Sequence, residues 1–353
     1  MKGQSRITEQ REDGEIPLLG LRRLAAMTVA ATLLLIAMGG AVRATDSGLA
    51  CPDWPACYGR WIPPADFNMW MEHSHRLWAG VVGLLIAWLT IWILLRYRDR
   101  PILVVASVAA SLLVLVQSGL GAAVVLFHLR APLVTAHLGM SFIIVACLIT
   151  ITVLAGRVDP REVEQRHRRM IGRGAAVLAV AVFGQALLGG QATGRGAAYV
   201  FNRVPIWLTD DPWTGHAREV LHVTHRVAGY LVAITVIAFA VWAIRRQHRA
   251  GILDPSGHRL LVGAVALVLL QVGLGIANVL TEAGVVSAIG HLAGASWLWS
   301  VLIALAVRGL PVSRRRPEGP AQSEPVEAES AGHVPAAADG TPNTVATPTP
   351  TRP

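Results

Sequence analysis

Four histidines stand inside apolar stretches of the chain and recur in a pattern. His75 and His225 each precede an arginine and lie 150 positions apart, whereas His137 and His291 each precede a leucine and lie 154 positions apart. An ionisable side chain inside a membrane is costly and usually has a function, and neutral imidazole binds metal ions through a ring nitrogen. The pattern therefore predicts one pair of metal-binding histidines in each half of the chain.

A haem iron is the metal that this arrangement favours. Two histidines at one depth on facing helices are axial ligands of haem in helical bundles. A single buried histidine is more often a hydrogen-bonded packing group, and a structural zinc site usually has four ligands, with cysteine among them. Because the pattern occurs twice, we predict haem ligation by both pairs. The small residues that leave room for a flat macrocycle are Gly80, Gly139, Gly229, Ala293 and Gly294.

Glu72 distinguishes the two halves. It lies three residues before His75, on the same face of an ideal helix, and the equivalent position in the second half is His222. An acid beside an iron ligand can move protons or stabilise positive charge on a bound group, although a carboxylate at a helix start is also favoured by the helix dipole. The difference favours a division of labour, with a reacting site in residues 1–156 and an electron-handling site in residues 170–309.

Arg76 and Arg226 directly follow the first histidine of each pair. A guanidinium near the outer interface can bind haem propionates through its planar fork. It can also extend from the helix to the membrane surface, as arginines near helix ends often do. The sequence leaves both interpretations open.

The chain as a whole is too apolar for a water-soluble protein of 353 residues. Hydrophobic residues make up 53% and charged residues 15%, and the mean hydropathy is +0.50. A helix of about 20 apolar residues crosses a bilayer. An all-α integral membrane protein with eight transmembrane helices is therefore predicted, with helices at 22–44, 72–95, 101–127, 132–156, 170–192, 218–244, 258–280 and 285–309.

The arginines concentrate in alternate loops, near residues 2–23, 96–100, 157–169, 245–259 and 308–316. By the positive-inside rule, this pattern places both termini in the cytoplasm and the four histidines toward the extracytoplasmic side of the cell membrane. The net charge of +9 therefore indicates topology and not nucleic-acid binding.

Two further matches extend the repeat. Gly39-Gly40 recurs as Gly189-Gly190, and QSGLGAA at 117–123 recurs as QVGLGIA at 271–277. They predict two pseudo-symmetric four-helix bundles in parallel orientation, with four extra residues of the second half in the loop between the sixth and seventh helices. The expected parts are a cytoplasmic N-terminal segment (1–21), a first bundle (22–156), a cytoplasmic linker (157–169), a second bundle (170–311) and a disordered cytoplasmic tail (312–353).

Cys51 and Cys57 lie close together in the segment GLACPDWPACYG of the first outer loop. An extracytoplasmic compartment permits disulfides, so the spacing predicts a Cys51–Cys57 bond, either structural or redox-active, with two free thiols as the alternative. Cys147 lies inside the fourth apolar stretch and is interpreted as a packing residue.

These motifs together resemble haem A synthase, a membrane enzyme family that matures the haem of cytochrome oxidases. The resemblance covers about residues 20–310. The first loop motif and the Glu-His-Arg start of the second helix are its specific parts, whereas the His-Leu and His-Arg pairs alone are weak. One departure is the third outer loop, 193–217, which lacks the cysteine pair of some members. The matching segments are GGAVRATDSGLACPDWPACYGRW, EHSHRLWAG, TAHLG, HVTHRVAGY and GHLAG.

The resemblance implies oxidation of the C8 methyl group of haem O to the formyl group of haem A. It implies His75 and His137 as axial ligands of the substrate haem, His225 and His291 as ligands of a haem b cofactor, and Glu72 as the catalytic residue. Haem O synthase and cytochrome oxidase assembly factors are the implied partners. Neither the residues nor the resemblance identify the electron acceptor, the source of oxygen or the oligomeric state.

Two other functions fit the same residues. A dihaem b-type membrane electron carrier would bind both haems permanently and would give Glu72 no essential role. A haem transporter or chaperone would need a site that opens to each side of the membrane in turn, yet all four histidines are expected on one side.

Overall fold

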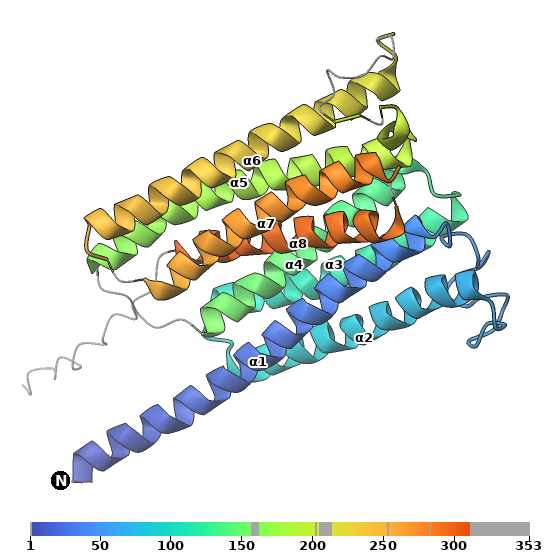
Figure 1. Ribbon diagram of the computed structural model, residues 1–353. Coiled ribbons are helices and arrows are strands. Elements are labelled where there is room, and N and C mark those ends of the chain that lie inside the picture. Colours follow the sequence, from blue (N-terminus) through green and yellow to red (C-terminus); the bar gives the residue numbers. More distant parts are fainter. Residues whose placement is uncertain are drawn as a thin grey trace, which may run out of the picture. The chain divides into compact units, whose positions relative to one another are not determined.

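The computed structural model describes residues 2–156, 162–201, 203–204, 214–252, 254–282 and 284–310. Within these ranges the regular structure is helical, apart from an isolated bridge between Cys57 and Arg60. Figure 1 shows long helices lying side by side. The elements are α1 (Lys2–Ala44), α2 (Phe67–Arg96), α3 (Pro101–Leu126), α4 (Ala131–Ala155), α5 (Glu162–Gly194), η1 (Ala197–Tyr199), α6 (Ala217–Arg249), α7 (Pro255–Leu280) and α8 (Val285–Arg308).

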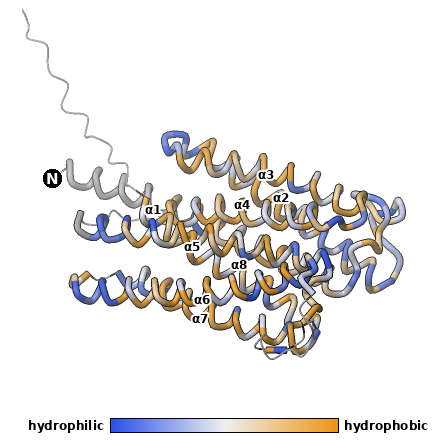
Figure 2. The backbone as a smooth tube through the Cα atoms, turned by 90° about the horizontal axis from the view of Figure 1, so that it is seen from above, coloured by the Kyte–Doolittle hydropathy of each residue, from blue (hydrophilic) through white to orange (hydrophobic). Residues whose placement is uncertain are grey.

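All eight α-helices have the length and apolar composition to cross a membrane, which confirms the number predicted from the sequence. Figure 2 shows hydrophobic residues along the middle of the helices and hydrophilic residues toward their ends. Only structures that satisfy their own backbone hydrogen bonds can cross the hydrocarbon core. The chain is therefore a multi-pass helical membrane protein.

Two helices begin more than five residues earlier than the apolar pattern predicts. α1 starts at Lys2, although its apolar span begins only at Leu18, and α5 starts at Glu162, inside the expected linker. A helix continues past its apolar stretch because each added residue gains a backbone hydrogen bond once the helix is nucleated. The expected tail, 312–353, and residues 157–161 of the linker lie outside the described residues.

Aspartate and proline residues define several helix starts. Asp66 accepts a hydrogen bond from Met69 N–H (3.0 Å) at the start of α2, and Asp254 accepts one from Gly257 N–H (3.1 Å) at the start of α7. Pro101 and Pro255 stand at the first helical positions of α3 and α7, where a missing N–H costs nothing. The Asp66 cap starts α2 five residues before the predicted boundary, so Glu72 lies inside the helix.

The helices contact one another in two closed groups. In the first group α1 contacts α2 and α4, and α3 contacts α2 and α4; in the second, α5 contacts α6 and α8, and α7 contacts α6 and α8. Contacts of α1 with α8, of α4 with α5 and of α4 with α8 join the groups. The Phe142 ring of α4 stacks on Trp299 of α8 with ring centroids 5.2 Å apart, so the apolar core continues between them.

The four extra residues of the second half do not lengthen the α6–α7 loop as predicted. α2 has 30 residues and α6 has 33, while the connections that follow them are residues 97–100 and 250–254. Most of the insertion therefore extends α6 by nearly one turn. A helix accommodates polar residues at its end as readily as a loop does, and Arg246, His248 and Arg249 in the last turn interact favourably with the helix dipole.

Candidate functional site

Each of the four pattern histidines packs against a glycine of the preceding helix in the chain. In every case the imidazole Cε1 lies close to the position that a Cβ atom on the glycine would take. Only glycine lets the ring come this close to the neighbouring backbone. The distances from an ideal Cβ to Cε1 are 3.2 Å for Gly39 and His75, 3.2 Å for Gly121 and His137, 2.8 Å for Gly189 and His225, and 3.3 Å for Gly275 and His291.

Three of these histidines are also held by a glutamine one helical turn before the glycine. The glutamine Nε2 donates to the histidine backbone carbonyl oxygen in each case. These glutamines were not predicted from the sequence, although two of them begin the repeated QSGLGAA and QVGLGIA segments. The equivalent position for His75 is Leu35. The donor–acceptor distances are 3.0 Å for Gln117 and His137, 2.7 Å for Gln185 and His225, and 2.9 Å for Gln271 and His291.

The histidines of each predicted pair lie in the same group of helices. The rings of His225 and His291 have centroids 6.5 Å apart and planes inclined by 79°, and His75 and His137 lie on α2 and α4 of the first group of helices. The Nδ1 atoms of His75, His137 and His291 are buried and have no hydrogen-bond partner among the described residues. In the described part of the chain, no group of three or more His, Cys, Asp or Glu residues forms a metal site.

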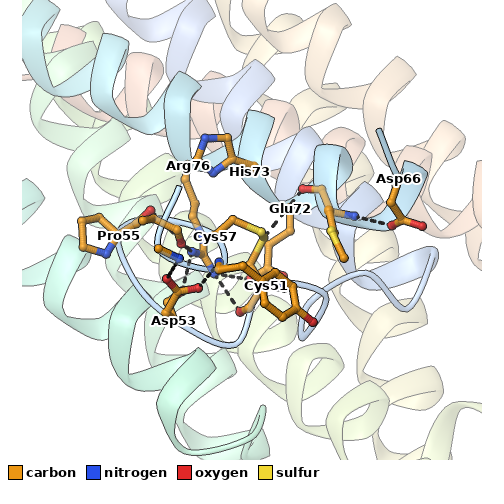
Figure 3. Close-up of a disulfide and its surroundings, with 12 residues drawn as sticks. Cys51, Asp53, Pro55, Cys57, Asp66, Glu72, His73 and Arg76 are labelled. Atoms are coloured by element: carbon orange, nitrogen blue, oxygen red, sulfur yellow. Dashed lines mark hydrogen bonds and ion pairs between the residues drawn. A yellow bond between two sulfur atoms is a disulfide. The ribbon is translucent and has the colours of Figure 1, made fainter. Parts of the chain in front are cut away.

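Glu72 and Arg76 bind the loop between α1 and α2, which carries the disulfide (Figure 3). The Glu72 side chain is buried; its Oε2 accepts a hydrogen bond from Cys51 N–H (2.8 Å), and its Oε1 pairs with Arg76 Nη2 (2.5 Å). Arg76 Nη1 also donates to the carbonyl oxygens of Asp53 (2.7 Å) and Ala56 (2.6 Å). Glu72 lies in the second turn of α2, beyond the first turn where the helix dipole acts. The interpretation as a helix-start carboxylate is therefore wrong.

The loop itself is tightly folded. The predicted disulfide is present between Cys51 and Cys57, whose residues are fully buried. The Asp53 carboxylate accepts hydrogen bonds from Gly59 N–H (2.7 Å) and Tyr58 N–H (2.6 Å), and the Gly59 bond in particular lowers the pKa of Asp53 below its usual value. His73 adds a further connection to α2, because its Nε2 lies 2.7 Å from the carbonyl oxygen of Trp61.

The second half holds its outer loop with a related set of contacts. Arg226 Nη2 donates to the carbonyl oxygen of Arg203 (2.7 Å), 23 residues earlier, as Arg76 does with Asp53. His222 takes the place of Glu72: its Nδ1 lies 2.6 Å from the carbonyl oxygen of Ala197 and its Nε2 lies 3.2 Å from Arg226 Nη1. Both arginines thus bind loop carbonyls, a role that neither of their two predicted interpretations included.

These features define a class: a multi-pass helical membrane protein with two intramembrane histidine pairs and a disulfide-linked loop at one end. The chain matches the COX15-CtaA family model, described as cytochrome oxidase assembly protein, over residues 22–69 and 65–303. The match covers most of the chain, and the protein belongs to this family.

Similar proteins from bacteria agree with the motif-based resemblance. The chain is 30% identical over 328 residues to a protein named heme A synthase from Shewanella oneidensis, covering 80% of this chain and 94% of that protein. It is 31% identical over 248 residues to a heme A synthase from an Exiguobacterium species, covering 69% and 78%. A heme A synthase from Bacillus licheniformis is 27% identical over 297 residues, covering 80% and 93%.

Proposed function

We propose that this protein catalyses haem A synthesis, oxidising the C8 methyl group of haem O to a formyl group for use by cytochrome oxidase. Family membership supports the reaction. The observation that supports the site assignment is the close packing of each of the four imidazoles on a helix glycine, together with the short separation of His225 and His291 in the second half. Haem O synthase and cytochrome oxidase assembly factors are the partners that this reaction requires.

In this proposal His75 and His137 hold the substrate haem, and His225 and His291 hold a haem b cofactor. The ring centroids of His225 and His291 are 6.5 Å apart, which is close enough for both imidazoles to bind one metal ion. Nδ1 is enclosed in His75, His137 and His291 and lies 3.0 Å from Gln185 Nε2 in His225, so Nε2 would be the ligating atom. The glycines provide the space that the rings occupy.

Haem, when bound, supplies the redox chemistry, and the protein orients it. The glutamines hold the carbonyls of three histidines and so fix the helix backbone from which each imidazole projects. Glu72 is the proposed catalytic residue of the first half. Its carboxylate, held by Cys51 N–H and Arg76, stabilises positive charge that develops as the methyl group is oxidised. We keep Arg76 and Arg226 as candidate partners of the haem propionates in addition to their loop contacts.

We further propose that the two groups of helices are pseudo-symmetric, parallel bundles, formed by residues 22–156 and 170–311. Reciprocal contacts support this arrangement. Gly40 of α1 packs on Leu292 of α8, and its equivalent, Gly190 of α5, packs on Leu138 of α4. Arg43 Nη2 donates to the carbonyl oxygen of Thr193 (2.8 Å), its own equivalent 150 residues later, as expected for residues beside a pseudo-twofold axis.

The distribution of arginines supports an orientation with both termini in the cytoplasm and both histidine pairs toward the extracytoplasmic side. All four histidines and the disulfide loop then share one end of the bundle. A disulfide at that end fits an oxidising compartment.

Extraction of bound haems tests the two sites. The full-length protein is produced together with haem O synthase, and haems are extracted from wild type, H137A, H291A and the exposed-histidine control H216A. We expect H137A to lose haem O and haem A but keep haem b, and H291A to lose haem b. H216A should match wild type. Two haem b molecules per chain, with no haem O or haem A in any sample, would identify an electron carrier instead.

A further inference from the structure

A strongly basic groove lies between the start of α5 and the end of α6, which Figure 1 shows as neighbouring helices. Its volume is about 1340 Å³, and none of the described residues that line it is acidic. The six arginines of the groove are Arg166, Arg169, Arg173, Arg245, Arg246 and Arg249.

Among the described residues, the arginines of the groove have no counter-charge. Two described acidic residues near the groove pair with other arginines: Glu164 with Arg168 (2.5 Å), and Asp254 with Arg308 (2.6 Å) and Arg168 (3.5 Å). Within the described part of the chain, none of the six groove arginines forms an ion pair, and all six are exposed. Six like charges around one groove repel each other, so an anion bound between them relieves the repulsion.

The groove is apolar where it runs toward the middle of the helices. Val241 and Trp242 line it and are 39% and 43% exposed, and Met170 and Ala238 lie beside them. The α6 arginines follow one to two turns later, at the helix end. Tryptophan is typical of the membrane interface. An apolar wall that ends in a cluster of guanidinium groups matches an acyl chain and its headgroup, whereas a free phosphate ion would leave the wall without a partner.

The cluster is larger in the second half of the chain than in the first. Arg173 and Arg246 correspond in the repeat to Arg23 and Arg96, but Arg166 and Arg169 correspond to Ile16 and Leu19, and Arg245 corresponds to Leu95. A positive-inside signal alone would need no such concentration, because the first half carries only two of these arginines. The nearly complete extra turn of α6, which includes Arg249, adds to the charge of this groove.

We propose that this groove binds the headgroup of an anionic phospholipid, with preference for a headgroup that carries two phosphates. Guanidinium forks bind phosphate oxygens in pairs, and basic pockets between transmembrane helices bind such headgroups. Six arginines and the large volume exceed what one phosphate needs. The groove is separate from the haem sites, since Arg245 lies 20 residues after His225 on α6, which is roughly 30 Å along a helix.

Native mass spectrometry of the full-length protein tests the proposal. Wild type, the triple variant R169Q/R245Q/R249Q and the matched control R96Q/R98Q/R100Q are purified in detergent and titrated with cardiolipin, phosphatidylglycerol or phosphatidylcholine. The control removes the same charge from the connection between α2 and α3. We expect wild type and control to bind cardiolipin more tightly than phosphatidylglycerol, and phosphatidylcholine least. The triple variant should bind cardiolipin about 100-fold more weakly, because each interfacial arginine contributes roughly a fivefold factor.

Inorganic pyrophosphate in a parallel titration distinguishes a lipid from a free phosphate ligand. Pyrophosphate that binds wild type as tightly as cardiolipin, and competes with it, would assign the groove to a soluble anion and overturn the proposal. Equal cardiolipin binding by all three proteins would overturn it as well. Because haem content is measured on the same samples, a failure of the groove proposal is distinguishable from a failure of the haem sites.

Discussion

The two halves of the molecule attach their outer loops to the membrane helices with the same geometry but different charges. In the first half, Arg76 and Glu72 bind the disulfide loop as an ion pair. In the second, Arg226 acts with His222. An imidazole is thus sufficient to support such an arginine and hold a loop carbonyl. Loop attachment alone therefore does not explain why the first half has a carboxylate, and this favours a chemical role for Glu72.

The halves also differ in how firmly they hold their histidines. In the second half both His225 and His291 have a glutamine on their backbone carbonyl, whereas in the first half only His137 does, and the sequence position equivalent to Gln185 is Leu35. A cofactor site must retain its haem, while a substrate site must exchange haem O for haem A. The missing glutamine is consistent with a first-half site that releases its ligand.

Exchanging the two loop-binding residues gives the largest expected effect. We expect E72H to form haem A about 100- to 10,000-fold more slowly, as is typical when a group that acts on the reacting centre is removed. The same variant should keep haem O bound and its disulfide intact. H222E should retain most activity. The amount of haem A formed per chain measures the activity of both variants, and alkylation of free thiols shows whether the disulfide is intact.

If E72H retained activity close to that of wild type, Glu72 would be a loop-binding residue only. E219Q is a useful control, because Glu219 is the carboxylate near the start of α6 and binds Thr214 and Gly215 in its own loop. It should leave haem A formation unchanged.

Alanine at the helix glycines should weaken haem binding according to the space at each site. In G189A the new Cβ would lie 2.8 Å from His225 Cε1, whereas in G275A it would lie 3.3 Å from His291 Cε1. Overpacking of this kind costs about 1–3 kcal/mol, or a roughly 5- to 150-fold loss of haem b affinity. G189A should therefore lose more haem b than G275A during purification. Equal retention by the two variants would show that these contacts do not position the ligands.

A smaller effect is expected from exchanging the glutamine and leucine positions. Q271L removes one hydrogen bond to the His291 carbonyl, worth about 1 kcal/mol, and should speed the loss of haem b to a haem-scavenging protein about fivefold. L35Q gives the first half the missing donor and should slow the release of its haem by a similar factor. Stopped-flow absorption measures both rates. The prediction requires Q271L to speed haem loss and L35Q to slow it, and rates that change in the same direction would contradict it.

Much of this architecture follows from residue patterns. Apolar length predicts all eight spans, and the short Cys51–Cys57 spacing predicts the disulfide. The recurrence of His-Arg and His-Leu pairs selects the four histidines that pack on helix glycines, because the helices repeat the same register in both halves. The glutamines also recur in the repeat. Their side chains, however, donate to backbone carbonyl oxygens, which every residue has, so the sequence does not show which residue accepts the hydrogen bond.

The loop contacts of Glu72 and Arg76 could not be predicted from the sequence. They join Glu72 and Arg76 of α2 to Cys51 N–H and to backbone carbonyls of residues 51–56. Helical periodicity carries no information about the path of a loop. The apolar pattern also predicts too late a start for α2, because the capping residue Asp66 precedes that pattern by several residues.

The smallest expected effect concerns the pH response of the outer loop of the first half. Hydrogen bonds from Gly59 and Tyr58 lower the pKa of Asp53 in the folded loop. Its contribution to loop stability is therefore complete above the unfolded pKa of about 4 and is lost as the pH falls through the lower folded value. Reduction of Cys51–Cys57 by a phosphine should accelerate in wild type as the pH falls from 7 to 3, once reagent protonation is corrected for. D53N should be fast throughout, and D46N, which removes another exposed carboxylate of this region, should follow wild type. An identical pH profile for D53N and wild type would show that Asp53 does not contribute to the stability of this loop.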